Sequence, residues 1–169
     1  MRDVPYVHVR SARVDDGAGI AAVYRPYVES SVASFESTAP DAAEMTRRCG
    51  AHPHLLWLVA ILPAGEVVGF AYAAPYRTRP AYRWSVETSV YVSEPRRGIG
   101  RSLMSALLAN CEADGFASAY ATVALPNDAS VALHEGLGFA AVGVFPRVGF
   151  KFGRGVDVGW WYRPLADRF

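Results

Sequence analysis

The sequence predicts an α/β (α+β) fold, in which helices flank both faces of a mixed central β-sheet. Strand patterns and helix patterns follow one another in the order β-α-α-β-β-β-α-β-α-β-β. This order amounts to about six to seven strands and about four helices. Residues 86–125 run strand, helix, strand, and such units pair in parallel with a right-handed crossover. Strands joined by a short turn pair antiparallel, so the sheet is predicted to be mixed.

The first half of the chain predicts one strand, two helices and a hairpin. Val7–Arg10 alternates as a strand does. Asp15 and Asp16 mark a helix start, because an apolar stripe at helical spacing follows them. Asp41 is predicted to cap a second helix. The hairpin consists of two apolar runs that a Pro-Ala-Gly turn separates, Leu55–Leu62 and Val67–Tyr76.

The second half predicts strands and helices in alternation, followed by two closing strands. The helices carry apolar residues on one side, and each ends near a glycine. In chain order, the predicted elements are a strand over Val86–Val92, a helix over Ser102–Glu112, a strand over Tyr120–Leu125, a helix from Pro126-Asn127-Asp128 to Gly138, and strands over Ala141–Phe145 and Val156–Tyr162.

Composition narrows the function classes. The 169 residues suit a single domain over 1–169, and a net charge of +1 argues against nucleic acid and membrane surfaces as partners. The N-terminus lacks an apolar signal core, and no apolar run reaches membrane-spanning length. Cys49 and Cys111 predict free thiols in a reducing compartment, so we expect a cytoplasmic protein. His52-Pro53-His54 lacks a third ligand, so no metal is predicted.

A basic, glycine-rich turn follows the Val86–Val92 strand and precedes a helix. The turn, residues 96–101, reads Arg-Arg-Gly-Ile-Gly-Arg. Glycines before a helix N-terminus allow backbone amides to bind phosphate. A dinucleotide fingerprint needs a third glycine where Leu103 stands, and a P-loop needs lysine where Arg101 stands. From the pattern alone, an anion site and a tight turn with solvated arginines are both open.

Glu87 is a carboxylate inside an otherwise apolar strand. Strand alternation places Glu87, Ser89 and Tyr91 on one face and the valines on the other. A carboxylate in such a place must be paired or hydrated. From the pattern alone it is either a general base or the partner of a nearby arginine, with three candidates: Arg77, Arg79 and Arg83.

Several segments, taken together in order and spacing, resemble the GNAT (GCN5-related N-acetyltransferase) superfamily, and within it the phosphinothricin acetyltransferase-like group. The resemblance covers nearly the whole chain. The matching segments are Phe35-Glu36, Tyr76 to Trp84, Val86 to Val92, Arg97 to Gly100, Leu125-Pro126-Asn127, Ser130 to Glu135, Lys151-Phe152-Gly153 and Asp157 to Trp161.

The resemblance implies a GNAT fold and acetyl-CoA as the acetyl donor. Backbone groups of the strand would hold the pantetheine arm, and amides of the turn would hold the pyrophosphate. Asn127 would contact the pantetheine from the next strand end. The implied cofactor-binding residues are Val90, Tyr91, Val92, Arg97, Gly98, Ile99, Gly100, Arg101, Ser102 and Asn127.

The resemblance also implies a direct attack by a primary amine on the thioester. The amine must first lose a proton, and Glu87 is the predicted base. His134 is the second catalytic candidate, because close members of the group carry histidine near the CoA sulfur. A helix histidine satisfied by a backbone carbonyl is the other reading of His134, and both stay open. The predicted oxyanion donor is a strand amide near Tyr91.

The implied acceptor is the α-amine of a small amino acid or analogue of the phosphinothricin, methionine sulfoximine or methionine sulfone type. Paired arginines suit a carboxylate or phosphinate. The predicted acceptor residues are Phe35, Arg77, Thr78, Arg79 and Tyr82. A homodimer is expected by resemblance only. The alternatives are a different amine, either a polyamine or a protein N-terminus, and a non-catalytic acyl-CoA-binding module. A nucleotide-binding oxidoreductase is disfavoured by Leu103 and by the strand order.

Overall fold

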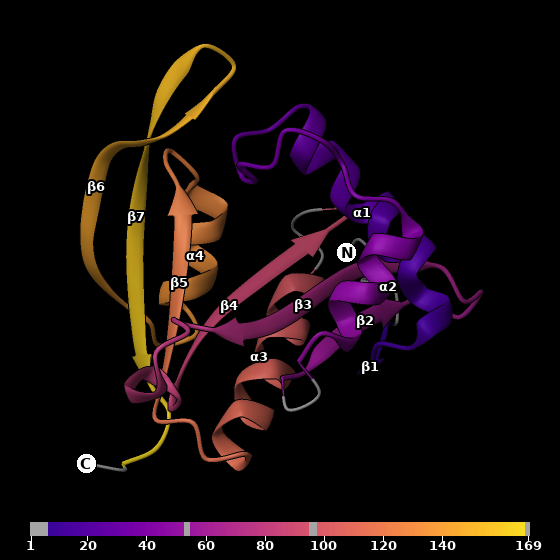
Figure 1. The fold of residues 1–169 in the computed structure, drawn as a ribbon. Helices are drawn as coiled ribbons and strands as arrows, with labels where there is room; N and C mark the ends of the chain where they lie inside the picture. Colours follow the sequence, from indigo (N-terminus) through magenta and orange to yellow (C-terminus); the bar gives the residue numbers. More distant parts are fainter. Residues whose placement is uncertain (1–6, 53–54, 95–97, 168–169) are drawn as a thin grey trace, which may run out of the picture.

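A computed structural model describes residues 7–52, 55–94 and 98–167, and Figure 1 shows its elements. The strands are β1 (His8–Ser11), β2 (Trp57–Ile61), β3 (Val67–Pro75), β4 (Ser85–Val92), β5 (Ser118–Ala124), β6 (Ala140–Lys151) and β7 (Arg154–Pro164). The α-helices are α1 (Gly17–Glu29), α2 (Ala42–Gly50), α3 (Ile99–Ala113) and α4 (Asp128–Glu135). Two short 3-10 turns, η1 and η2, span Val14–Asp16 and Pro80–Tyr82.

The seven strands form one sheet in the order β1-β2-β3-β4-β5-β7-β6. Neighbouring strands pair antiparallel except β4 and β5, which pair in parallel across the α3 crossover. The predicted mixed sheet with helices on both faces is therefore confirmed. No helix in the described ranges combines the length and apolarity needed to cross a membrane.

The core lies on both faces of the sheet because β2 and β3 bury alternate residues in opposite directions. Leu58 and Ala71 join the cluster beneath α3, whereas Val59 and Phe70 join the cluster beneath α1 and α2. In Figure 1, α1 and α2 lie over β2 to β4, and α3 and α4 lie on the opposite side. The strands β5, β7 and most of β6 have no helix of the first pair above them, and this side of the three strands is the open face. The end of β6 meets the end of α1, where Lys151 binds Val28 O.

Asp16 stands at the predicted helix start, but its side chain does not cap α1. It accepts hydrogen bonds from Arg10 Nη1 and Nη2 at 2.6 and 2.8 Å, and from the Arg13 amide at 2.6 Å. The side chain is thus committed to β1 and η1. In α2 the prediction is confirmed, because Asp41 Oδ1 accepts from the Glu44 amide at 2.9 Å.

The last two strands are longer than predicted. β6 and β7 form a long hairpin that turns at Phe152 and Gly153, both with positive φ. The sequence pattern predicted too short a strand for β6, because the proline and glycine in its middle disfavour a regular strand. The structure accommodates them with an irregular stretch between Phe145 and Gly149, where the register with β7 shifts.

The β4–β5 pair separates partway along its length, which positions the site. β4 pairs with β5 only over Ser85–Glu87, whereas β5 stays paired with β7 as far as Ala124. From Thr88 onward β4 has no strand on its β5 side. The two strands therefore diverge into a split that is open at the N-terminus of α3.

Candidate active site

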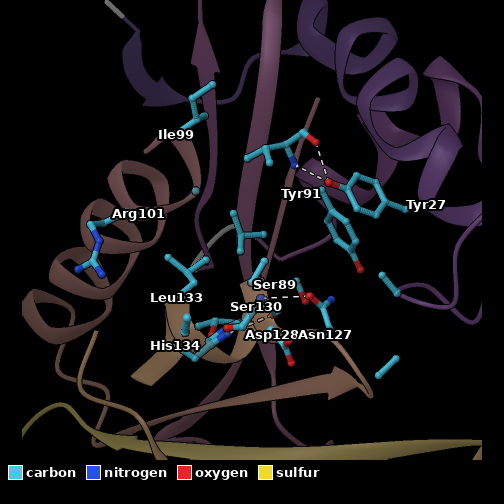
Figure 2. Close-up of a pocket in the computed structure, with 18 of the residues that line it drawn as sticks. Tyr27, Ser89, Tyr91, Ile99, Arg101, Asn127, Asp128, Ser130, Leu133 and His134 are labelled. Atoms are coloured by element: carbon cyan, nitrogen blue, oxygen red, sulfur yellow. Dashed lines mark hydrogen bonds between the residues drawn. The ribbon is translucent and has the colours of Figure 1, made fainter. Parts of the chain in front are cut away.

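A cavity of about 740 Å³ occupies the split between β4 and β5. Figure 2 shows that its walls come from α1, β4, the start of α3 and α4. The described lining residues include Tyr27 and Ala33, Thr88 to Val92, Gly98 to Arg101, Thr122, Ala124, and most of the segment from Asn127 to His134. The predicted pantetheine strand, residues Gly98 to Arg101 of the phosphate turn and Asn127 thus border one cavity.

The backbone of β4 supplies the hydrogen-bonding edge of this cavity. Ser85 and Ser93 pair with β3 through Tyr76 N to Ser85 O at 3.3 Å and Ser93 N to Val68 O at 2.9 Å. Alternate residues of a strand direct their peptide groups to opposite sides. The peptide groups of Val90 and Val92 therefore face the split, whereas those of Tyr91 face β3, contrary to the expectation for Tyr91.

Tyr27 already forms hydrogen bonds with the peptide groups of Val92. Its hydroxyl donates to Val92 O at 2.7 Å and accepts from Val92 N at 3.4 Å, as the dashed lines of Figure 2 show. The Tyr91 ring packs edge-on against Tyr24 and Tyr27, on the α1 face of the sheet. Among the three predicted pantetheine residues, Val90 is the one whose backbone is directed into the split without such a partner in the described chain.

The phosphate turn ends in a helix N-terminus at the edge of the cavity. Gly98 precedes α3 with a φ of 74°, a left-handed conformation that favours glycine. The amides of Ile99, Gly100 and Arg101 belong to the first turn, where helix geometry supplies no carbonyl partner. They are placed to donate to an anion. Position 97 lies outside the described residues, so the predicted role of Arg97 has no structural counterpart.

Two residues of this turn differ from the prediction. The Ser102 amide donates to Gly98 O at 3.0 Å and its hydroxyl donates to the same oxygen at 3.2 Å, so Ser102 is committed within α3. The Arg101 guanidinium donates to Gly136 O at 3.0 Å, just beyond α4. Its side chain therefore links α3 to α4, and its backbone amide, in the first turn of α3, is placed to donate to the predicted anion.

Asn127 precedes α4, and His134 lies in its last turn. Asn127 Oδ1 accepts from the Ser130 amide at 3.1 Å and caps the helix. His134 is buried, and its Nδ1 lies 2.8 Å from Ser130 O, so Nδ1 carries the hydrogen and donates. Burial lowers the pKa of His134, and its buried Nε2 has no partner among the described residues. Burial thus favours the neutral imidazole, a carbonyl satisfies its Nδ1, and the ring borders the cavity.

Glu87 lies beside the cavity on the opposite face of β4 from Val86 and Val90. Thr122, which lines the cavity, donates from Oγ1 to Glu87 Oε1 at 3.0 Å. No arginine in the described ranges forms an ion pair with Glu87, so the predicted salt-bridge alternative is not seen. The half-buried carboxylate is held by one hydroxyl and is available as a proton acceptor.

The predicted acceptor residues fall into two groups. Arg77 stacks on Tyr76 at 4.4 Å and donates to the Tyr76 carbonyl at 2.7 Å, and Tyr82 packs edge-on against the same ring. Thr78 and Arg79 follow as exposed residues before η2.

Phe35 lies elsewhere, on the segment between α1 and α2, with its ring against Gly149 of β6. Gly149 pairs with Val156, while Tyr120, which stacks on Tyr76, pairs with Tyr162. These β7 positions are six residues apart, which is about 20 Å of strand. Phe35 and Tyr82 therefore flank opposite ends of the open face, and one chain does not bring them together.

Sequence reasoning missed Tyr27 and Thr122. Tyr27 belongs to the apolar stripe of α1 and gives no local sign of a hydroxyl aimed at β4. Thr122 sits in a buried strand with unremarkable neighbours. Only the register of β4 with β5 shows that its hydroxyl meets Glu87.

Comparisons with known proteins place this geometry in a family. The model of the Acetyltransferase (GNAT) family matches residues 20–139. A phosphinothricin N-acetyltransferase of Streptomyces viridochromogenes is 40% identical, over 93% of this chain and 87% of its own. An L-methionine sulfoximine/L-methionine sulfone acetyltransferase of Pseudomonas aeruginosa is 38% identical, over 89% of this chain and 90% of its own.

The crystal structure of a GNAT superfamily phosphinothricin acetyltransferase from Sinorhizobium meliloti, in complex with AcCoA, has the same fold. It superposes with a TM-score of 0.91 at 38% identity, covering 95% of this chain and 89% of that one. The split strands, the open helix N-terminus and these similarities agree. The chain therefore belongs to the acetyltransferase (GNAT) family and is an acetyl-CoA-dependent N-acetyltransferase.

Proposed function

We propose that this enzyme acetylates the α-amine of a small amino acid or amino-acid analogue of the phosphinothricin, methionine sulfoximine or methionine sulfone type. The observation that carries the proposal is the split between β4 and β5. It combines the Val90 peptide groups, the α3 N-terminus and the Thr122–Glu87 pair around one cavity. The names of the relatives that cover most of the chain supply the acceptor class.

In the proposed binding mode, the pantetheine arm of acetyl-CoA adds to the free edge of β4 through the Val90 carbonyl, which leaves the Val90 amide for the thioester oxygen. The first-turn amides of α3 hold the pyrophosphate, where the helix dipole adds about half a positive charge. Asn127 borders the same path at the start of α4. This chain thus supplies backbone donors for most of the cofactor contacts.

In the proposed reaction, Glu87 takes a proton from the acceptor ammonium, directly or through water, while Thr122 orients the carboxylate. The amine nitrogen then attacks the thioester carbon. The C–N bond forms and the C–S bond breaks as the thiolate of CoA leaves. The attacking nitrogen loses its second proton, which passes through solvent to the thiolate, and Glu87 returns its own proton to solvent. A donor amide on β4, that of Val90, would stabilise the oxyanion. His134 borders the cavity, but its Nδ1 donates to Ser130 O and burial disfavours the protonated ring, so no proton transfer is assigned to it.

For the acceptor carboxylate or phosphinate, the proposed partners are Arg77 and Arg79, with Tyr82 beside them. Their position supports this assignment, because they lie at the end of the open face where β4 begins. Phe35 bounds the other end of that face. This arrangement favours an anionic amino acid over a polyamine, because a cationic substrate gains nothing from arginines.

We also propose a cytoplasmic homodimer of one-domain chains. The continuous sheet supports one domain over residues 1–169. The unpaired thiols of Cys49 and Cys111 suit a reducing compartment. Large apolar side chains exposed on β6 and its turn support a second copy of the chain as partner: Val142, Val144, Phe145, Val148, Phe150 and Phe152.

The acceptor is tested by thiol release from acetyl-CoA with a panel of amines. Phosphinothricin, methionine sulfoximine and methionine sulfone are expected to release thiol, whereas spermidine and an alanyl peptide are not. Activity confined to the polyamine or the peptide would replace the proposed acceptor. Tight CoA binding by calorimetry without turnover on any amine would make the chain an acyl-CoA-binding module.

Glu87→Gln tests the base. The amide cannot accept the ammonium proton, so kcat is expected to fall by about 10²- to 10⁴-fold at neutral pH and to recover partly at high pH. Glu66→Gln, at an exposed residue before β3, is the control and should leave kcat unchanged. A Glu87→Gln enzyme with the wild-type pH–rate profile would exclude the role.

A further inference from the structure

Lys151 is the single lysine of the chain, and its ammonium is surrounded by backbone carbonyls. Nζ donates to Val28 O at 2.6 Å, Ser31 O at 2.8 Å and Ser34 O at 2.6 Å. An ammonium has three donors, so all of them are used. Charged donors form the stronger hydrogen bonds in proteins. Lys151, at the end of β6, therefore binds a segment more than a hundred residues earlier in the chain.

The three carbonyls belong to the end of α1 and the segment that follows it. The last carbonyls of a helix lack partners within the helix, and the helix dipole makes that end negative. A cation there satisfies both. Neighbouring contacts fix the same segment: Tyr24 Oη and Ser34 Oγ lie 2.7 Å apart, and Arg48 binds Glu36 through two nitrogens at 2.7 and 3.0 Å.

This segment borders the site on two sides. Ala33, between two of the carbonyls that Lys151 binds, lines the cavity of the β4–β5 split. Phe35, one residue after the third, rests against Gly149 so closely that a side chain at that position would collide with the ring. The β6–β7 hairpin and the α1–α2 segment thus meet through Lys151 and through the Phe35–Gly149 contact.

We propose that Lys151 is a positioning residue for acetyl transfer: its ammonium holds residues 30–36 in place as a wall of the acetyl-CoA cavity and as the Phe35 end of the acceptor face. The proposal rests on the proposed function for its kinetic consequences, though not for its structural ones. It assigns a role to the lysine of the Lys-Phe-Gly segment, at the end of β6, which the reaction itself does not use.

Lys151→Met keeps the length of the side chain and removes the three donors. We expect faster amide hydrogen exchange across residues 30–36, and KM values for acetyl-CoA and acceptor raised about 10-fold, the effect of losing one strong charged hydrogen bond. kcat should change by less than about 3-fold, because no reacting group is removed. Lys151→Arg should give exchange rates and KM values between those of the wild type and Lys151→Met, since a planar guanidinium cannot donate to all three converging carbonyls.

Arg25→Met is the matched control. Arg25 lies on α1, the helix whose end Lys151 binds, but it is exposed and forms one 3.4 Å ion pair with Glu29. It should change neither local exchange nor KM. If Lys151→Met lowers the unfolding midpoint while exchange over 30–36 and both KM values stay at wild-type levels, Lys151 is merely structural and the proposal is wrong.

A second measurement needs no variant. Because Lys151 is the only lysine, labelling with an amine-reactive ester reports on it alone apart from the N-terminal amine. We expect Lys151 in the native protein to react at least about 10-fold more slowly than in the urea-unfolded chain. Equal rates would refute the ammonium contacts. Hydrogen exchange, labelling and CoA affinity do not depend on turnover. An enzyme inactive on every amine would therefore refute the proposed function, while these three measurements would still test the role of Lys151.

Discussion

Asp16 shows how a single buried charge fixes the start of this fold. Its side chain is 8% exposed and forms a two-nitrogen contact with Arg10, while it also accepts from the Arg13 amide. The Arg10 hydrogen bond is the main cause that holds the pKa of Asp16 below its ordinary value of 3.8. The ionised carboxylate is thus the form that the fold needs.

Asp16→Asn is expected to lower the free energy of unfolding by about 3 kcal/mol at pH 7, because it leaves Arg10 without its partner. A lowered folded-state pKa contributes stability above the unfolded pKa, and that stability is lost as the pH falls through the folded value. The gap between wild type and variant should therefore shrink below pH 3.8. Urea denaturation of both proteins at pH 7 and at a pH below 3.8 measures this difference in unfolding free energy. The exposed neighbour Asp15→Asn is the control, and equal losses from the two variants would contradict the prediction.

His134 carries a second prediction at this scale. Burial lowers its pKa from the ordinary 6.5, so the folded state favours the neutral ring and stability declines as the pH falls from 6.5 toward the lowered value. Nitrogen-15 NMR of the imidazoles should find one of the four histidines with hydrogen on Nδ1 and a titration below 6.5. Titration at or above 6.5, or hydrogen on Nε2, would contradict it.

At the scale of elements, Gly98 and Gly100 at the start of α3 differ in what an alanine in their place would change. Gly98 has open space around it but a φ of 74°, whereas Gly100 is helical and an added Cβ would meet Leu133 Cδ2 at 3.5 Å, an ordinary contact. Gly98→Ala should cost about 1 kcal/mol of stability, since a left-handed conformation strains alanine. Gly100→Ala should stabilise the free protein by up to about 1 kcal/mol.

Both substitutions are expected to weaken CoA binding, Gly98→Ala by distorting the turn and Gly100→Ala by placing a methyl group at the phosphate. Thermal denaturation of the free protein, with calorimetric titration of CoA, separates the two effects. A Gly100→Ala protein that binds CoA as tightly as wild type would show that the pyrophosphate does not lie against this helix N-terminus.

The elements themselves were largely predictable, because each has a local cause. Asp41 caps α2 as expected, and the apolar run of Val86–Val92 is a strand with Glu87 on the predicted face. The middle of β6 was not predictable, because Pro146 and Gly149 oppose strand structure locally and only pairing with β7 maintains it. Asp16 lies at the predicted helix start, but its ion pair with Arg10 was not predictable, because Arg10 comes from another element.

At the scale of the whole molecule, the site depends on contacts between distant segments. Thr122 meets Glu87 from 35 residues away, and Tyr27 meets Val92 from 65 residues away. No local pattern encodes such pairs; the register of the sheet and the packing of α1 create them. The same reason explains why Phe35 and Tyr82 could be proposed as neighbours from the sequence although the sheet separates them.

The open edge of the sheet carries the last prediction. β6 is the outermost strand of the sheet and exposes a row of apolar side chains, which an isolated chain would leave in water. A stable dimer needs about 800 Å² from each partner, and this strand with its turn offers the apolar part of it. Sedimentation should find the wild type as a dimer and the double variant Val144→Arg with Phe150→Arg as a folded monomer. Val14→Arg changes a residue as exposed as Phe150, 76% in each case, but far from β6, and should leave the dimer intact. A monomeric wild type, or a double variant that still sediments as a dimer, would show that β6 does not join two copies of the chain.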